Sequence, residues 1–200
     1  MRLLLAAGVI HVSLVLAAPK QPAIREGDGF RITLAPTWLP QPEIERQVTA
    51  GLPPDVVGGA LAFGDTSANA ALQIMWVETK APSPKPAREE LEAFHETLKS
   101  YLENSGSKTT AFKLSEKENR MTARHTFEGS GDPRMTTLQV SSAGVTTAGL
   151  TRSWSAQCVW STPKGKQVCE TAMAQFKVTE PAASFQKLPA PTPKPKEKKK

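Results

Sequence analysis

The chain has 200 residues, two cysteines and a formal net charge of +6, a length suited to one domain around one buried core. The segment 187–200 carries a net charge of +5 and Arg2 carries one more, so residues 19–186 are neutral overall. A neutral domain lacks the electrostatic surface that a polyanion requires, which argues against specific nucleic-acid binding.

The first residues have the three regions of a secretory signal peptide. Arg2 precedes an apolar run over residues 3–16, and the small residues Ala17 and Ala18 follow. A membrane-spanning helix needs about 20 apolar residues, more than this run supplies. We therefore expect residues 1–18 to be cleaved near Ala17 or Ala18 and the protein to be periplasmic or secreted. The alternative is an uncleaved N-terminus that anchors the protein in a membrane.

The first part of the domain alternates short strands with proline-rich connections. Phe30, Ile32 and Leu34 alternate with polar residues, which is typical of a half-buried strand. Asp65–Asn69 has the composition of a turn, so the strands that flank it are expected to form a hairpin. The predicted elements are strands at Gly27–Leu34, Ala60–Phe63 and Ala70–Glu78 and a helical turn near Glu43–Val48.

The strongest helix signal is Ala87–Glu103. Acidic residues are enriched in its first turns, where they complement the helix dipole. The apolar residues at helical spacing are Leu91, Phe94, Leu98, Tyr101 and Leu102. His95 is followed four positions later by Lys99, where a helical zinc motif needs a second histidine. We therefore expect no metal site here and an exposed His95.

Strands return after this helix, and a second helix closes the domain. The predicted strands are Ala111–Leu114, Met121–Glu128, Met135–Ser141 and a strand-forming stretch over Val145–Trp160, and the final helix is Lys166–Val178. Together the elements predict an α+β fold: a single domain with an antiparallel β-sheet covered by two main helices, as in an α/β/α sandwich. This globular domain is expected to span residues 19–183.

The two cysteines are expected to form one disulfide bond. Cys158 lies at the end of a predicted strand, and Cys169 lies on the apolar stripe of the final helix. A bond between them would fasten that helix to the sheet and stabilise the fold by about 3 kcal/mol in the chain-entropy model. The alternative is a pair of buried free thiols. The spacing matches no zinc pattern, and nothing in the sequence indicates a cofactor.

Trp154, Trp160 and His125 are the candidates for a ligand cleft. Both tryptophans lie among serines and threonines, and clefts favour aromatic walls with a few polar groups. His125 lies on the apolar face of its strand, where it is either a core residue or a general base. No nucleophile adjoins it and no catalytic residue is assigned, but an exported hydrolase that uses His125 with a serine stays open as an alternative.

Residues 184–200 are expected to form a disordered tail rich in proline and lysine. Its last lysines are Lys194, Lys196, Lys198, Lys199 and Lys200. The tail stays solvated, contacts an anionic surface of the cell envelope at about 1 kcal/mol per lysine near a charged membrane, or serves as a Pro-Lys spacer that crosses an envelope layer over a short distance. Such a contact would be a salt-sensitive tether and not a specific site.

The order of the elements, with Gly29-Phe30 and Pro36-Thr37-Trp38 in and after the first strand, resembles the PsbP-like α/β/α sandwich family. The resemblance implies a small exported accessory or binding domain, in most cases without enzymatic activity, and offers no catalytic residue to carry over. The function favoured at this point is an exported, non-enzymatic envelope or secreted domain that binds a partner protein or a small ligand. The hydrolase and the surface-tethered anion binder are the alternatives.

Overall fold

The computed structural model describes residues 22–82, 87–131 and 133–191. The predicted signal peptide, its cleavage positions and the tail lysines from residue 194 onward lie outside these residues. The described chain forms one α+β domain with three α-helices and a mainly antiparallel sheet, which confirms the predicted fold class. No helix in this part of the chain is long and apolar enough to cross a bilayer.

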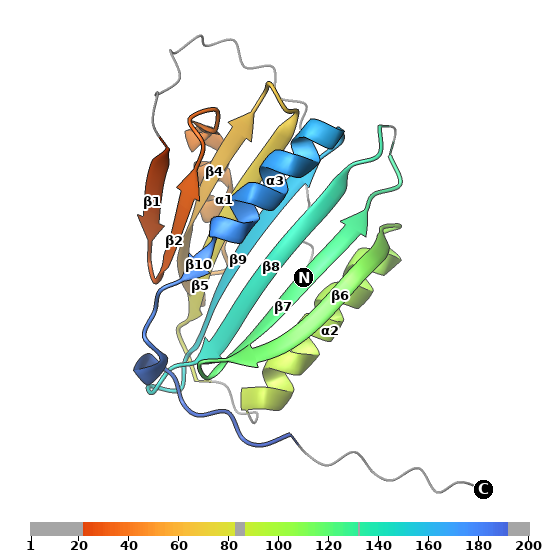
Figure 1. Cartoon of the computed structure of the whole chain (residues 1–200). Helices are drawn as coiled ribbons and strands as arrows, with labels where there is room; N and C mark the ends of the chain where they lie inside the picture. The colour runs from red at the N-terminus through yellow and green to blue at the C-terminus, as the bar shows by residue number, and fades with distance from the viewer. Residues whose placement is uncertain (1–21, 83–86, 132, 192–200) are drawn as a thin grey trace, which may run out of the picture.

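A seven-stranded sheet forms the centre of the molecule (Figure 1). Its strands are hydrogen-bonded in the order β3-β4-β5-β9-β8-β7-β6, and every neighbouring pair is antiparallel. The bounds are β3 (Leu39–Pro40), β4 (Val56–Asp65), β5 (Ala70–Thr79), β6 (Lys108–Lys117), β7 (Arg120–Glu128), β8 (Thr136–Val145) and β9 (Thr151–Trp160). Because consecutive strands are joined by short turns, most neighbours in the sheet are also neighbours in the sequence.

Helices cover both faces of this sheet. On one face, α3 (Pro163–Gln175) packs over β9, β5 and β8, beside a small sheet of β1 (Ala23–Gly27), β2 (Phe30–Leu34) and β10 (Lys177–Val178). On the other face, α2 (Ala87–Asn104) packs over β6, β7 and β8, and α1 (Pro42–Ala50) packs against β4. Figure 1 shows α3 in front of the large sheet and α2 behind it. The two main helices therefore lie on opposite faces and over different strands.

The first predicted strand proves to be the second half of a hairpin. Asp28 and Gly29 form a turn, and β1 pairs with β2 in antiparallel register from Ala23–Leu34 to Gly27–Phe30. Gly29 adopts φ of +73°, a left-handed conformation that glycine tolerates best. The sequence reads as one strand because the turn contains only two residues.

Two other boundaries also differ from those predicted. The stretch over 145–160 is interrupted by a turn at residues 146–150, where the amide of Thr146 donates to the carbonyl of Leu150 and Gly149 has φ of +81°. The last helix ends at Gln175, because Phe176 has extended backbone angles and Lys177–Val178 then pairs with β2. Apolar periodicity alone does not reveal this change from helix to strand.

The main core lies between the large sheet and the layer formed by α3 and the small sheet. Its buried members include Phe30, Ile32, Leu72, Ile74 and Trp154. Cys158 on β9 and Cys169 on α3 are joined within this core as a disulfide with a Cα–Cα distance of 5.6 Å. The link fixes α3 over the sheet, as the two periodicities predict.

The first turn of α3 is positioned by a capping residue. The side chain of Thr162 accepts a hydrogen bond from the amide of Gly165 at 2.9 Å and donates one to the carbonyl of Ala68 at 2.8 Å. Pro163 occupies the first helical position, where its missing N–H costs nothing. The cap and the disulfide thus hold both the start and the middle of the helix.

The packed part of the chain extends beyond the boundary predicted at residue 183. After α3 and the short helical turn Ala182–Ser184, Phe185 packs edge-on against Trp154, and both are buried. Leu188 is buried in a second cluster with Leu91, Met121 and Ala143 on the α2 side of the sheet. The chain therefore crosses from the α3 side to the α2 side before it reaches the tail, because its two apolar residues each find a core to enter.

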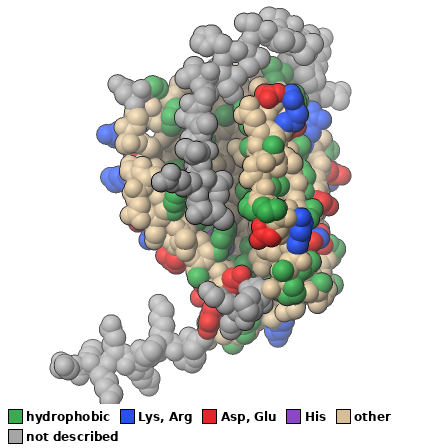
Figure 2. Space-filling view, turned by 180° about the vertical axis from the view of Figure 1, so that it is seen from behind, with side chains coloured by type: hydrophobic (Ala, Val, Ile, Leu, Met, Phe, Trp, Pro, Cys, Tyr) green, Lys and Arg blue, Asp and Glu red, His purple; other side chains and the backbone are tan. Residues whose placement is uncertain are grey.

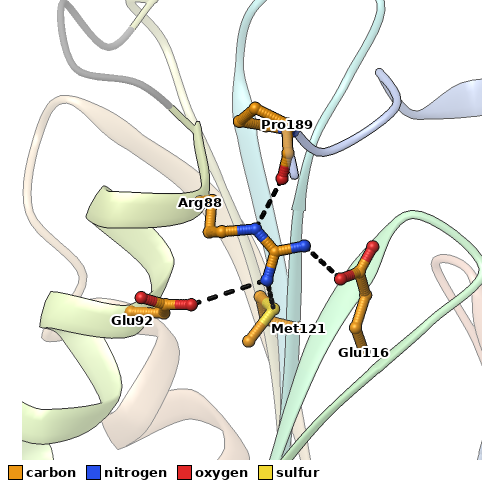
Figure 3. Close-up of polar contacts among 5 residues, drawn as sticks. All are labelled: Arg88, Glu92, Glu116, Met121 and Pro189. Carbon is orange, nitrogen blue, oxygen red and sulfur yellow. Dashed lines mark hydrogen bonds and ion pairs between the residues drawn. The ribbon is translucent and has the colours of Figure 1, made fainter. Parts of the chain in front are cut away.

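Arg88 near the start of α2 holds this crossing in place (Figure 3). Its guanidinium donates to the carbonyl of Pro189 at 2.6 Å, to the carboxylate of Glu116 on β6 and to that of Glu92 on α2 at 3.5 Å, and it contacts the sulfur of Met121. The side chain is 10% exposed. One buried cation thus links α2, β6 and the C-terminal segment.

Candidate binding groove

An open groove with a volume of about 290 Å³ lies beside α3 on the front face of the sheet. It exists because α3 packs over β5, β9 and β8, which leaves the same face of β7 and β6 beside the helix. The lining residues are Thr110, Arg124, Thr126, Glu128, Thr136, Leu138, Trp160, Lys166 and Glu170. They come from four neighbouring strands and from α3, so the groove is built on rigid elements.

The floor of the groove is apolar and well packed. Leu138 and Trp160 are buried, and Thr136 on β8 lies directly opposite Trp160 on β9. Two residues further along β8, Leu138 lies opposite Cys158, which is joined by the disulfide to α3. The disulfide therefore fixes the distance between the helix wall and the strand floor.

Threonine hydroxyls line the groove from the outer strands. Thr110 reaches the groove because the β6–β7 register shifts between Thr109 and Ala111, which leaves Thr110 as an extra residue. Its hydroxyl donates to the carbonyl of Thr126 at 3.1 Å. Bulges of this kind re-aim a side chain at the edge of a sheet.

The charged residues that line the groove lie on two elements, two on α3 and two on β7. Lys166 and Glu170 lie one turn apart on α3 with 4.0 Å between their charged atoms. Arg124 and Glu128 lie on β7, and within the described residues neither forms an ion pair or a side-chain hydrogen bond. The cross-strand neighbour of Arg124 on β6 is Lys113, which carries the same charge. The strand side of the groove therefore presents charges that are free to meet a ligand.

The two tryptophans proposed for one cleft lie in different places. Trp160 contributes to the groove, whereas Trp154 lies toward the other end of β9, beside a hollow of about 60 Å³. Trp154 is buried, and its indole N–H donates to the carbonyl of Asp28 at 2.6 Å. Its first role is thus structural: it holds the β1–β2 turn against the large sheet.

His125, the third residue proposed for that cleft, lies on the opposite face of the sheet. It is 1% exposed, and its ring lies 4.6 Å from that of Phe112 on β6. Neither ring nitrogen has a hydrogen-bond partner in the described part of the chain, so the serine contact that a hydrolase would require is not seen there. Burial, with a smaller contribution from Lys99, lowers the pKa of His125.

His95 is also buried, which makes the prediction of an exposed helical histidine wrong. It is 0% exposed on α2, and both of its ring nitrogens lack partners among the described residues. Burial first, and the proximity of His125 second, lower its pKa from 6.5 to about 4. Figure 2 shows the molecule from behind, and no histidine is visible on that face. The two imidazoles belong to the interface between helix and sheet and not to the groove.

Trp160 could be identified from the sequence, but the charged residues of the groove could not. Arg124 and Glu128 lie on β7, Lys166 and Glu170 lie on α3, and only the position of α3 over the sheet brings the two elements to one groove. The alternation of polar and apolar residues along Met121–Glu128 was visible in the sequence. It did not reveal which other side chains share that face.

No family model matches the chain, and no curated protein matches it. Among solved structures, the chain is similar to cyanobacterial PsbP (CyanoP) from Synechocystis sp. PCC 6803, with 12% identity over 86% of this chain and 98% of that chain and a TM-score of 0.44. It is also similar to the Saccharomyces cerevisiae Ran-binding protein Mog1p, with 11% identity over 83% of this chain and 99% of that chain and a TM-score of 0.41. The first of these structures is a PsbP, the family that the element order resembles. We assign no function and no site residue from either.

Proposed function

We propose that the protein is an exported, non-enzymatic binding domain of the cell envelope or the secreted space, and that its groove beside α3 binds a partner protein or a small ligand. The observation that carries the proposal is the pair of charges on β7, Arg124 and Glu128, which face the groove without partners among the described residues. Sites that bind ligands combine an apolar surface with a few well-placed polar groups. This groove has both.

The rigidity of the walls supports binding over a purely structural role. The floor belongs to the central strands, and the helix wall is fastened by the Cys158–Cys169 link. A site on such elements loses little conformational freedom when a ligand binds, which improves affinity for a given contact area. Surface charges without a binding role gain nothing from being held in this way.

Export is supported by the signal-peptide pattern at residues 1–18 and by the cysteine pair in the core. Disulfides persist in oxidising compartments and are rare in the cytosol. The test is fractionation of the native host, with mass measurement of the recovered protein. The proposal expects an extracytoplasmic chain that starts at Ala18 or Pro19 and has no free thiols. Recovery of a full-length, reduced chain from the cytoplasm would contradict it.

Binding at the groove is tested by placing a photocrosslinking amino acid at Thr136 or at Glu170 in the native host. The matched control position is Thr97, which is exposed on α2 on the other side of the sheet. We expect the same crosslinked species from both groove positions and none from the control. Equal crosslinking from all three positions would mean that the groove is not the site.

The lysines at the end of the tail are a candidate tether to an anionic envelope surface. Leu188 is buried on the α2 side, so the described chain approaches its end on the face opposite the groove. A chain tethered in this way would keep its groove turned away from the surface. Deletion of residues 192–200 should then release the protein from anionic vesicles and leave crosslinking at Thr136 unchanged.

A further inference from the structure

The groove continues into the open edge of the large sheet. β6 is the last strand in the order, and among the described residues it pairs on one side only, with β7. Its other side therefore offers backbone N–H and C=O groups to an additional strand. Extended peptides bind many domains by adding to such an edge, where main-chain hydrogen bonds provide affinity and side-chain positions provide specificity.

The groove face of β6 is basic. Lys108 lies opposite Glu128, and Lys113 lies opposite Arg124. Lys117 lies on the same face, four residues after Lys113 and opposite Arg120. The acidic residue of the strand, Glu116, lies on the other face, where it binds Arg88 of α2. A strand added beside β6 would thus meet lysines at alternate positions on the groove side.

Lys113 and Arg124 form the most informative pair. They are directly opposite each other on neighbouring strands, both are exposed, and neither has an ion-pair partner among the described residues. Like charges in this relationship destabilise a sheet. By contrast, Lys117 is paired with Glu118 at 3.2 Å. Lys166 in the groove is likewise paired, with Glu170 at 4.0 Å, which leaves Lys113 and Arg124 as neighbouring cations without an ion-pair partner among the described residues.

Lysines on an edge strand also protect a sheet from aggregation. That role explains a lysine on β6 itself, but it does not explain Arg124, which lies on the second strand and lines the groove. Lys166 adds a third cation from the helix wall. Because Glu128 and Glu170 also line the groove and Lys166 pairs with Glu170 at 4.0 Å, the lining itself is neutral. The unpaired positive charge lies at Lys113 and Arg124 beside the edge, where an anionic group would meet it.

We infer that the β6 edge and the groove bind an extended, acidic segment of a partner protein, which adds to the sheet as a further strand with a carboxylate beside Lys113, whose positive charge is reinforced by Arg124 on the next strand. This inference rests on the proposed function and specifies the class of its ligand. The regular part of the edge runs from Ala111 to Lys117, after the bulge at Thr110. Carboxylates two residues apart in the segment would point to the same side, since side chains alternate along a strand.

The experiment measures binding of a synthetic fluorescent peptide in which glutamates alternate with valine and threonine, by anisotropy, to the purified chain. We expect saturable binding that weakens with added salt. The double variant Lys113→Gln, Arg124→Gln should bind at least about tenfold more weakly, because it removes two charged hydrogen-bond donors. The control Lys177→Gln removes an exposed lysine from β10 in the small sheet, away from the β6 edge, and should bind as the wild type does.

Two peptide controls distinguish strand addition from charge attraction. The same peptide with N-methylated amides at alternate positions keeps its carboxylates but loses main-chain donors, so it should lose binding. The version with lysine in place of glutamate should not bind. Equal binding by the N-methylated peptide, unchanged binding by the double variant, or no binding of the acidic peptide would each overturn the inference.

The double variant removes a repulsive pair, so it is expected to fold, and thermal unfolding should show equal or higher stability. Specific crosslinking from Thr136 and Glu170 without binding of the acidic peptide would refute the acidic strand but leave the proposed function standing. Loss of both the specific crosslinking and the peptide binding would refute the inference and the proposed function together.

Discussion

His95 on α2 and His125 on β7 share one buried interface, and none of their four ring nitrogens has a hydrogen-bond partner in the described residues. The rings are packed by Phe94 and Phe112 at centroid distances of 5.2 and 4.6 Å. Two imidazoles held in this way are stable only when neutral. A proton on either would be a buried charge beside another basic group.

The first prediction is therefore loss of stability in acid. In the folded state the pKa of His95 lies at about 4 and that of His125 is also lowered, whereas the unfolded chain regains the ordinary value of 6.5. As the pH falls, the unfolded state therefore binds protons at a higher pH than the folded state does. The stability contribution of His95 is complete above pH 6.5 and is lost toward pH 4, by about 3 kcal/mol in total.

Urea unfolding at several pH values in this window measures the effect. Carboxylates also titrate there, so the informative quantity is the difference between the wild type and His95→Leu. We expect a flatter pH dependence in the variant, because leucine has no proton to gain. If the free energy of unfolding changed with pH in the same way in both proteins, the imidazole of His95 would not be the group that the prediction requires.

A second prediction concerns the link between β9 and α3. Both sulfur atoms lie in fully buried residues, and the cysteines are 11 positions apart. Reduction should lower the free energy of unfolding by about 3 kcal/mol, because a loop of this size is released in the unfolded chain. The measurement is urea unfolding with and without reductant. The Cys158→Ala, Cys169→Ala variant should have the same free energy of unfolding as the reduced protein, and reductant should not change it. If reductant also left the stability of the wild type unchanged, the prediction would be wrong.

Much of this fold could be predicted from local patterns. The β4–β5 hairpin, α2 and α3 follow from alternation, helical spacing and turn composition, and Cys169 lies on the stripe that faces Cys158. These features depend on neighbours in the sequence. Long-range register does not: nothing local to Lys113 predicts that it lies opposite Arg124.

The rotation of α2 was also beyond the sequence pattern. Leu91 and Leu102 are buried as predicted, but His95 occupies the buried face, while Phe94 and Tyr101 are 49% and 45% exposed. The apolar stripe is wider than the surface that the sheet can cover. Which part of it is buried depends on the shape of β6, β7 and β8, so the position of His95 emerges only from tertiary packing.

A third prediction tests the link through Arg88. Arg88→Ala should lower the free energy of unfolding by about 2 kcal/mol, because it leaves Glu116 and the carbonyl of Pro189 without their donor. It should also loosen the C-terminal segment, so that trypsin cuts after Lys187 faster than in the wild type. The matched control is Arg46→Ala, which removes an exposed ion pair with Glu43 and should change neither quantity appreciably. Equal cleavage rates in all three proteins would show that Arg88 does not hold this segment.

The fourth prediction concerns the turn between β1 and β2. Gly29 has φ of +73°, and a Cβ atom added there would lie 2.8 Å from the indole of Trp154 and 2.9 Å from the carboxylate of Glu180. Its carbonyl also accepts amide hydrogen bonds from Thr179 at 2.7 Å and Glu180 at 3.1 Å, so the turn cannot move without breaking them. Gly29→Ala should therefore lower stability by at least about 2 kcal/mol, from backbone strain and overpacking combined.

The control for this substitution is Gly131→Ala. A Cβ atom at Gly131 would meet its nearest neighbour, the carbonyl of Pro133, at an ordinary distance of 3.9 Å, and its φ is not left-handed. Thermal unfolding of both variants should show a lower midpoint for Gly29→Ala and little change for Gly131→Ala. If the two midpoints moved together, the contact between the first hairpin and Trp154 would be looser than the geometry indicates, and β1–β2 would not be anchored through this turn.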